Sequence, residues 1–173
     1  MILIKRIVCV CFVIFLTACA SGVTKMSTGN STTVNVAPNI NVVRLQLSDN
    51  AKKLVPDNTG FNQEALQATV ERILRASNLQ QANSSQSLDI EITSFRTRSA
   101  LTAMMFGFMA GNDNIEGVVS IRDASGTVLK KSQITASYAL GGAAGGQNET
   151  RMSWLYEAFA KHVVAEVTGV PVK

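Results

Sequence analysis

The sequence is poor in the residue types on which metal sites, disulfide scaffolds and charged binding surfaces depend. Its 173 residues include one histidine and three cysteines, and charged residues make up only 16%. Hydrophobic residues make up 46%, which is typical of a chain that buries a core and excludes wholesale disorder. The length fits one domain of ordinary size.

The longest hydrophobic run is too short to cross a membrane. Residues 7–18 form an apolar run of 12 that follows Lys5 and Arg6, whereas a transmembrane helix needs about 20 residues. A run of this length after basic residues is typical of a secretory signal peptide that is removed. We therefore predict a signal peptide over residues 1–18.

The apolar run ends in Leu16, Thr17, Ala18 and Cys19. These four residues resemble the lipobox of bacterial lipoproteins. The resemblance implies cleavage before Cys19, a diacylglycerol on its thiol and an acyl chain such as palmitate on the new amine. Ala20 stands where an Asp would retain the protein in the inner membrane, which implies the outer membrane, facing the periplasm. The alternative is an ordinary cleaved signal with a chance cysteine.

Removal of the signal peptide changes both the thiol content and the charge. Cys9 and Cys11 leave with it, so the mature chain has no free thiol and no disulfide once Cys19 is lipidated. The loss of Lys5 and Arg6 lowers the formal net charge from +4 to +2, with 14 basic and 12 acidic residues remaining. We therefore expect a membrane partner, reached through the lipid anchor, and no nucleic acid.

The mature chain divides into a tether and one domain. Residues 20–40 are rich in Ser, Thr, Asn and Gly, so we predict a lipidated Cys19 and flexible tether over 19–40, with a random-coil span of about 25 Å. Residues 41–173 then form a single periplasmic domain.

Hydrophobic periodicity gives the order of elements in that domain. Alternating residues predict four strands, apolar stripes predict two helices, and residues 49–60 are predicted as a loop. The strands lie near 43–47, 88–95, 115–122 and 127–140, and the helices near 62–77 and 149–168. The order β-α-β-β-β-α predicts an α+β fold, with a small mixed or antiparallel sheet and both helices packed on one face.

The second half of the chain carries a further resemblance. Asp123, Gly126, Val128 and Leu129 form a hairpin turn and strand, followed by the glycine-rich residues 141–146 and the last helix. This pattern resembles a family of uncharacterised bacterial lipoprotein domains, and in outline the periplasmic α+β domain of curli-secretion-channel-like lipoproteins. The resemblance implies the fold and supplies no catalytic residues.

Each candidate catalytic or metal site lacks a required residue. The glycine-rich residues 141–146 lack the Lys and Ser or Thr of a phosphate loop. Residues 112–123 lack the first Asp and the last Glu of a calcium loop. His162 and Glu166 lie one helical turn apart without a second His or a Cys to complete a zinc site. We expect no cofactor, no metal and no enzymatic activity.

Residues 100–110 stand out as an uncharged run rich in Met and Phe. One interpretation places the run in the core, where flexible Met side chains fill gaps. The other makes it an apolar surface that contacts a protein partner, a second copy or the bilayer. The candidate contact residues are Met105, Phe106, Phe108 and Met109. We expect the first residues of the run to lie in the core and 106–110 to be the part at the surface.

These features together predict an outer-membrane lipoprotein. We expect it to act as a non-enzymatic scaffold or accessory subunit of a cell-envelope assembly, with a protein partner or a second copy of itself. The alternative is a periplasmic lipoprotein that binds a lipid or a small molecule, with the apolar run lining the pocket.

Overall fold

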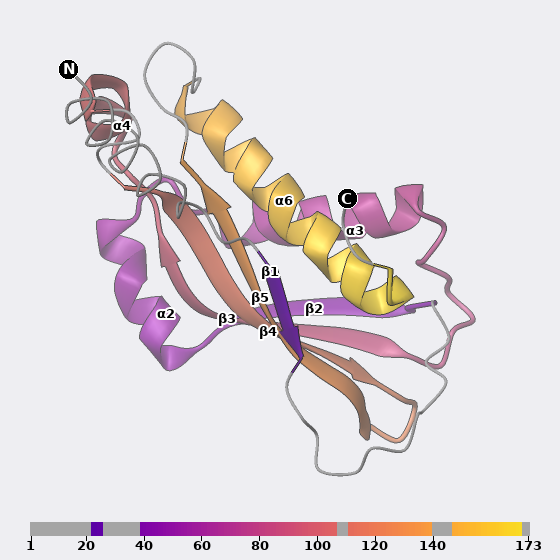
Figure 1. Ribbon diagram of the computed structural model, residues 1–173. Helices are drawn as coiled ribbons and strands as arrows, with labels where there is room; N and C mark the ends of the chain where they lie inside the picture. Colours follow the sequence, from indigo (N-terminus) through magenta and orange to yellow (C-terminus); the bar gives the residue numbers. More distant parts are fainter. Residues whose placement is uncertain (1–21, 26–38, 107–110, 140–146, 171–173) are drawn as a thin grey trace, which may run out of the picture.

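A five-stranded sheet in the order β1-β5-β4-β3-β2 organises the computed structural model, which describes residues 22–25, 39–106, 111–139 and 147–170 (Figure 1). The strands are β1 (Gly22–Lys25), β2 (Val42–Leu47), β3 (Ser87–Arg96), β4 (Asp113–Arg122) and β5 (Val128–Tyr138). β2 and β3 are parallel, and every other neighbouring pair is antiparallel. The predicted mixed sheet is confirmed.

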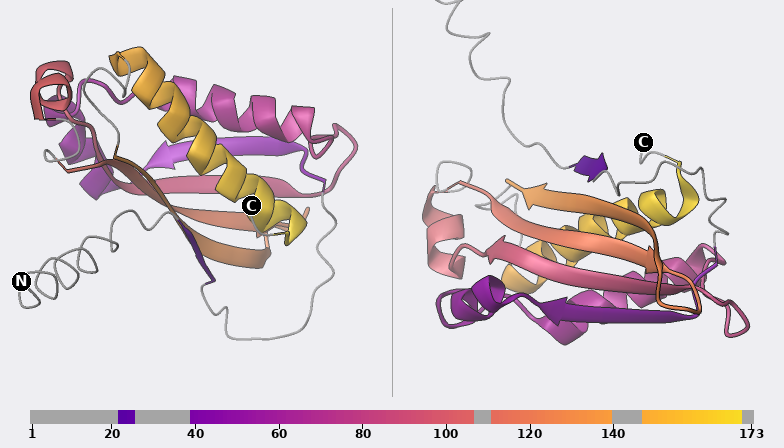
Figure 2. Two further views of the ribbon diagram at one scale, coloured as in Figure 1. Left: turned by 45° about the horizontal axis from the view of Figure 1, so that its top comes forward. Right: turned by 90° about the horizontal axis from the view of Figure 1, so that it is seen from below.

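Two long helices lie side by side on one face of this sheet, as predicted (Figures 1 and 2). The helices are α2 (Asp49–Leu54), the 3-10 turn η2 (Val55–Asp57), α3 (Gln63–Ala76), α4 (Ala100–Phe106) and α6 (Asn148–Thr168). α3 and α6 cover the sheet, whereas α2 and α4 lie at its end. The α+β fold class is therefore confirmed. None of the helices in the described ranges has the length and the apolar character of a transmembrane span.

The buried side chains are those that the periodicity predicts. Along β2, Val43 and Leu45 are buried while Val42 and Arg44 are exposed, because successive side chains of a strand point to opposite faces. α3 contributes a buried stripe at helical spacing, and the Asn62 side chain caps its first turn by accepting from the Ala65 N–H at 2.8 Å. The helical stripes and the inner face of the sheet thus form one core. Its members from α3 and α6 include Leu66, Val70, Leu74, Leu155, Phe159 and Val163.

Residues 49–60 are not the loop that their turn residues predict. They begin with α2, whose first turn is capped by Ser48: its hydroxyl oxygen accepts from the Ala51 N–H at 3.2 Å. Asp49 in the first turn and Lys52 and Lys53 in the last complement the helix dipole. The capping residue was present in the sequence, and Pro56 lies inside the 3-10 turn that follows α2, near its start.

Two further elements differ from the predictions. Gly22–Lys25, inside the predicted tether, form β1 and pair with β5, because the outer edge of β5 offers free backbone groups. Ala100–Phe106 form α4, a helix that we did not predict for residues 100–110. The Ser99 hydroxyl caps this helix by accepting from the Thr102 N–H at 3.1 Å, and Ala, Leu and Met favour helices.

The contact of α6 with the sheet gives a first testable prediction. Phe159 is fully buried, and its ring lies against Gly117 of β4, where even a Cβ atom would come within 3.2 Å of it. Phe159→Ala should lower the free energy of unfolding by about 3–5 kcal/mol, because it removes an aromatic ring and leaves a cavity. Thermal and urea unfolding measure this loss.

The control is Lys161→Ala, an exposed position on the same helix, for which we expect a change within about 0.5 kcal/mol. Equal melting temperatures for the two variants would show that this face of α6 does not pack on the sheet.

Candidate functional site

α4 presents an apolar surface to solvent at one end of the sheet. Leu101 and Met105 are each 67% exposed and Phe106 is 59% exposed, while Ala103 on the other side of the helix is buried. Leu101 and Met105 are one turn apart and share one side of the helix, whereas Phe106 lies about 100° further round, at the last residue of the helix. We call Leu101, Met105 and Phe106 the α4 surface.

The α4 surface includes two of the four predicted contact residues. Met105 and Phe106 belong to it, and the expectation that Phe106 lies at the surface agrees with its exposure. Leu101, near the start of the run, is exposed and not in the core. Phe108 and Met109 lie outside the described residues, as do the predicted signal peptide and Cys19. That these side chains contact a partner stays a prediction.

Next to α4 lies a buried cluster of charges that sequence reasoning did not find. Arg98, Asp113 and Arg151 have almost no exposed side-chain surface. Asp113 accepts from the Arg98 backbone N–H at 2.7 Å and from its guanidinium at 2.9 Å, and Nε of Arg151 lies 3.4 Å from the same carboxylate. We call these three residues the buried ion cluster. Because the three residues lie far apart in the sequence, no local sequence pattern indicates that their side chains are in contact.

The buried ion cluster joins four elements at the end of the sheet. The Arg98 guanidinium also donates to the backbone oxygens of Tyr138 and Ala139 at the end of β5. The Arg151 guanidinium, from α6, donates to the backbone oxygen of Arg98 and to Oδ1 of Asn148. Two guanidinium groups thus share one carboxylate, and backbone and amide oxygens accept further hydrogen bonds from both groups. This arrangement holds β3, β4, β5 and α6 together immediately before α4 begins.

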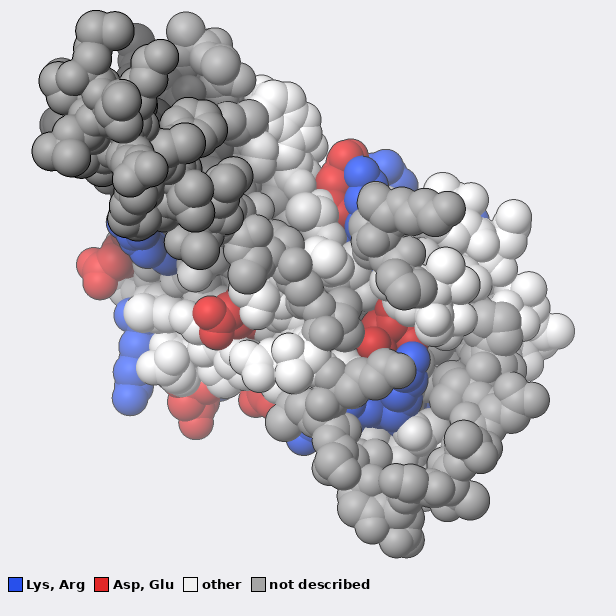
Figure 3. Space-filling model, in the orientation of Figure 1, with Lys and Arg blue, Asp and Glu red and all other residues white. Residues whose placement is uncertain are grey.

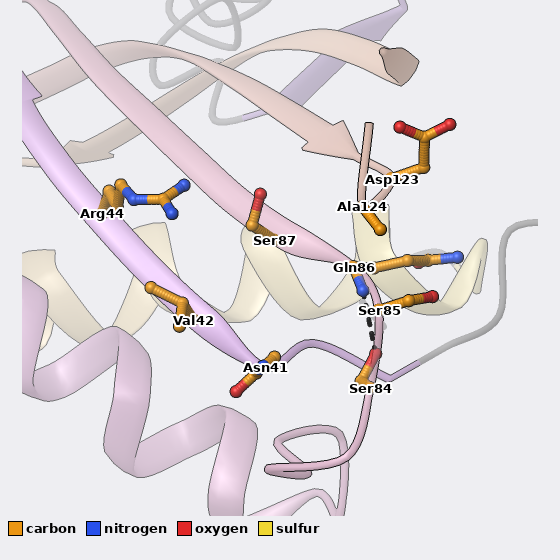
Figure 4. Close-up of a pocket in the computed structure, with 9 residues that line it drawn as sticks. All are labelled: Asn41, Val42, Arg44, Ser84, Ser85, Gln86, Ser87, Asp123 and Ala124. Atoms are coloured by element: carbon orange, nitrogen blue, oxygen red, sulfur yellow. Dashed lines mark hydrogen bonds between the residues drawn. The ribbon is translucent and has the colours of Figure 1, made fainter. Parts of the chain in front are cut away.

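A polar hollow of about 350 Å³ lies at the opposite end of the sheet (Figure 4). It lies between the start of β2, the segment that leads into β3 and the turn from β4 to β5. Its lining residues are Asn41, Val42, Arg44, Ser84, Ser85, Gln86, Ser87, Asp123 and Ala124. Hydroxyl, amide and charged groups predominate, and α4 takes no part. The hollow therefore does not correspond to a lipid pocket lined by the apolar run.

The acidic residues considered for metal binding have other roles. Glu166 turns to β5, where its carboxylate accepts from the Ser132 hydroxyl at 2.7 Å and pairs with Lys130 at 3.0 Å. The Asp123 carboxylate accepts from Ser125 and Thr127 in its turn, and the hydroxyl of Ser125 lowers its pKa. Burial lowers the pKa of His162. The described ranges contain no group of three His, Cys, Asp or Glu side chains that could hold a metal ion, and the glycine-rich residues 141–146 lie outside them.

Charged side chains are dispersed over the visible face of the domain. Figure 3 shows small groups of Lys and Arg interspersed with Asp and Glu, separated by uncharged residues. On the open sheet face, Asp89 pairs with Arg44 at 3.1 Å and with Arg122 at 2.7 Å. These partly exposed pairs contrast with the buried ion cluster, which has the same composition of one Asp and two Arg.

The chain belongs to the family described as a domain of unknown function, DUF4410, whose profile matches residues 33–142. The matched region runs from before β2 to beyond the end of β5 and includes α4 and two members of the buried ion cluster. No curated protein sequence matches the chain.

Solved structures share the fold at low sequence identity. A leucine-to-methionine variant of PelC from Paraburkholderia phytofirmans, a dodecamer, is 12% identical with a TM-score of 0.51, over 84% of this chain and 97% of that chain. A second crystal form of the PelC dodecamer gives 13% and 0.49 over the same shares. A minor lipoprotein from Acinetobacter baumannii is 12% identical with a TM-score of 0.45, over 74% of this chain and 92% of that chain. At such identities the likeness concerns the fold alone.

The two Asp–Arg–Arg groups give a second testable prediction. Asp113→Ala leaves two arginines buried without their counter-charge, and should lower the free energy of unfolding by about 3–5 kcal/mol. The matched control is Asp89→Ala. Its carboxylate also binds two arginines, but its side chain is 30% exposed, so the loss should be about 1 kcal/mol or less.

Urea unfolding of the three proteins measures both losses. Equal destabilisation by the two substitutions would contradict the special role assigned to the buried ion cluster.

Proposed function

We propose that this protein is an outer-membrane lipoprotein, anchored at Cys19 and facing the periplasm. In this proposal it acts as a non-enzymatic scaffold or accessory subunit of a cell-envelope assembly. The anchor is supported by the order of basic residues, a 12-residue apolar run and Leu16-Thr17-Ala18-Cys19. The observation that carries the accessory role is the α4 surface.

An exposed group of three large apolar side chains favours a contact role. Leu101, Met105 and Phe106 are more exposed than the other residues of α4 for which burial is described. Burial in a contact would remove their surface from water, at about 25 cal/mol per Å². Exposed apolar patches on otherwise polar domains commonly mark interaction sites. A contact surface, without a described catalytic or metal-binding group, supports an accessory role and not an enzyme.

Assembly with further copies of the chain is supported by the likeness to PelC. The PelC structure is a dodecamer, and the alignment covers 97% of the PelC chain. The aligned region therefore includes nearly the whole subunit of that dodecamer. We propose that the present chain also forms a homo-oligomer in the membrane. Native mass spectrometry and crosslinking of the full chain in detergent test this proposal, and a monomer at every concentration would contradict it.

The anchor gives a third testable prediction. Cys19→Ser should abolish lipidation, so that the protein keeps its signal peptide or leaves the outer-membrane fraction. The control is Cys9→Ser, because that cysteine lies in the predicted signal peptide outside the lipobox, and this variant should be processed like the wild type. Membrane fractionation and the mass of the N-terminal peptide report the result. A Cys19→Ser protein that is cut and stays in the outer membrane would refute the lipoprotein assignment.

A further inference from the structure

β1 fixes where the chain enters the domain. Gly22 pairs with Thr135 and Lys25 with Ser132, so β1 runs antiparallel to β5. Gly22 is therefore the residue of β1 nearest to Tyr138, where β5 ends. The first residue of β1 is therefore nearer to this end of the sheet than to the other.

α4 lies at the same end of the sheet. It connects the end of β3 to the start of β4, and the first residue of β4, Asp113, pairs with Tyr138. Figure 1 shows α4 and the beginning of β1 towards the same side of the molecule, and Figure 2 shows α4 beyond the strand ends in both views. Only β5 separates β1 from β4 in the sheet, so the two strands are about 10 Å apart.

The covalent chain limits the distance of Cys19 from this point. Cys19 precedes Gly22 by three residues, and three fully extended residues span at most about 11 Å. A flexible tether over 19–40 would have allowed about 25 Å. Because β1 is part of the sheet, a lipid on Cys19 brings the bilayer close to the end of the domain that carries α4.

The side chains at this end suit a bilayer surface. α4 has no charged residue, and its exposed side chains are Leu, Met and Phe. The single tryptophan, Trp154, is 42% exposed near the start of α6, and its ring centroid lies 5.3 Å from that of Tyr138. Trp and Tyr favour the headgroup region of membranes. The opposite end, in contrast, carries the polar hollow.

We infer that β1 clamps the domain to the membrane and that the α4 surface contacts the same bilayer as the lipid anchor. This inference rests on the lipidation of Cys19 proposed above. It names the partner of the α4 surface as a lipid surface, and not a second copy of the chain. Oligomer contacts then use other faces of the domain.

A fluorescent probe on a single introduced cysteine tests the contact. Lipidation blocks the Cys19 thiol and cleavage removes Cys9 and Cys11, so Met105→Cys provides the one free thiol of the mature chain. The matched control is Val170→Cys, which is 63% exposed just after α6 ends, at the opposite end of the sheet. Both full-length proteins carry an environment-sensitive dye and are reconstituted into vesicles of phosphatidylethanolamine and phosphatidylglycerol that contain nitroxide-labelled lipid.

We expect emission from position 105 to shift to shorter wavelength and to be quenched by the nitroxide, and emission from position 170 to do neither. A blue-shifted dye at 105 that the lipid nitroxide does not quench would assign the surface to a second copy and overturn the inference. So would a dye at 105 that stays in water while mass spectrometry shows a lipidated Cys19. An unlipidated Cys19 would instead refute the proposed function, and the inference with it.

A linker insertion tests the role of β1 separately. About ten Gly and Ser residues add a root-mean-square reach of about 17 Å. Inserted between Ser21 and Gly22, they should abolish the quenching at position 105, because the anchor no longer holds the end of the sheet at the bilayer. The same linker between Met26 and Ser27 lies after β1 and should leave the quenching unchanged. Equal quenching in the two insertion variants would show that β1 does not orient the domain.

Discussion

The carboxylate of Asp113 holds together the end of the domain that carries α4. Charges without exposed surface are tolerated only where partners and hydrogen bonds replace water, and Asp113 serves both Arg98 and Arg151. Arg98 links it to the end of β5, and Arg151 brings in α6. Since α4 begins two residues after Arg98, the position of the α4 surface follows from this cluster. Asp89 also pairs with two arginines, but its side chain is in contact with water, so it has no comparable role.

The parts of the fold that were predictable from sequence are those with one buried face. The alternation around Val43 and Leu45 and the stripe of α3 behind its Asn62 cap predict their elements, because burial imposes a period of two on strands and 3.6 on helices. A partner that is distant in the sequence leaves no such period. Nothing near Asp113 identifies Arg151 as its neighbour, because the sheet topology and the docking of α6 create that contact. The run at 100–110 carries no charge and few polar groups, so its pattern could not distinguish a core segment from an exposed one.

Short elements escaped sequence analysis for a different reason. β1 has four residues, too few for an alternation to be read, and it exists because β5 supplies a partner edge. α2 had a readable signal, Ser48 followed by Asp49, but Pro56 and the residues after it suggested a loop. In both cases a tertiary contact decides the local structure: the edge of β5 for β1, and burial of Ala51 beside β3 for α2.

The pairing of β1 with β5 has two physical consequences that act together. It covers a sheet edge that would otherwise present free backbone groups to other chains, and it leaves only two residues between the sheet and Cys19. A lipid attached through a flexible chain holds a domain near a membrane without orienting it, whereas orientation requires a second point of contact. The α4 surface lies at the end of the sheet that is nearer to the first residue of β1, which pairs with Thr135 three residues before β5 ends, and the buried ion cluster holds that end together. The membrane orientation that we propose therefore depends on a strand pairing and on a buried carboxylate.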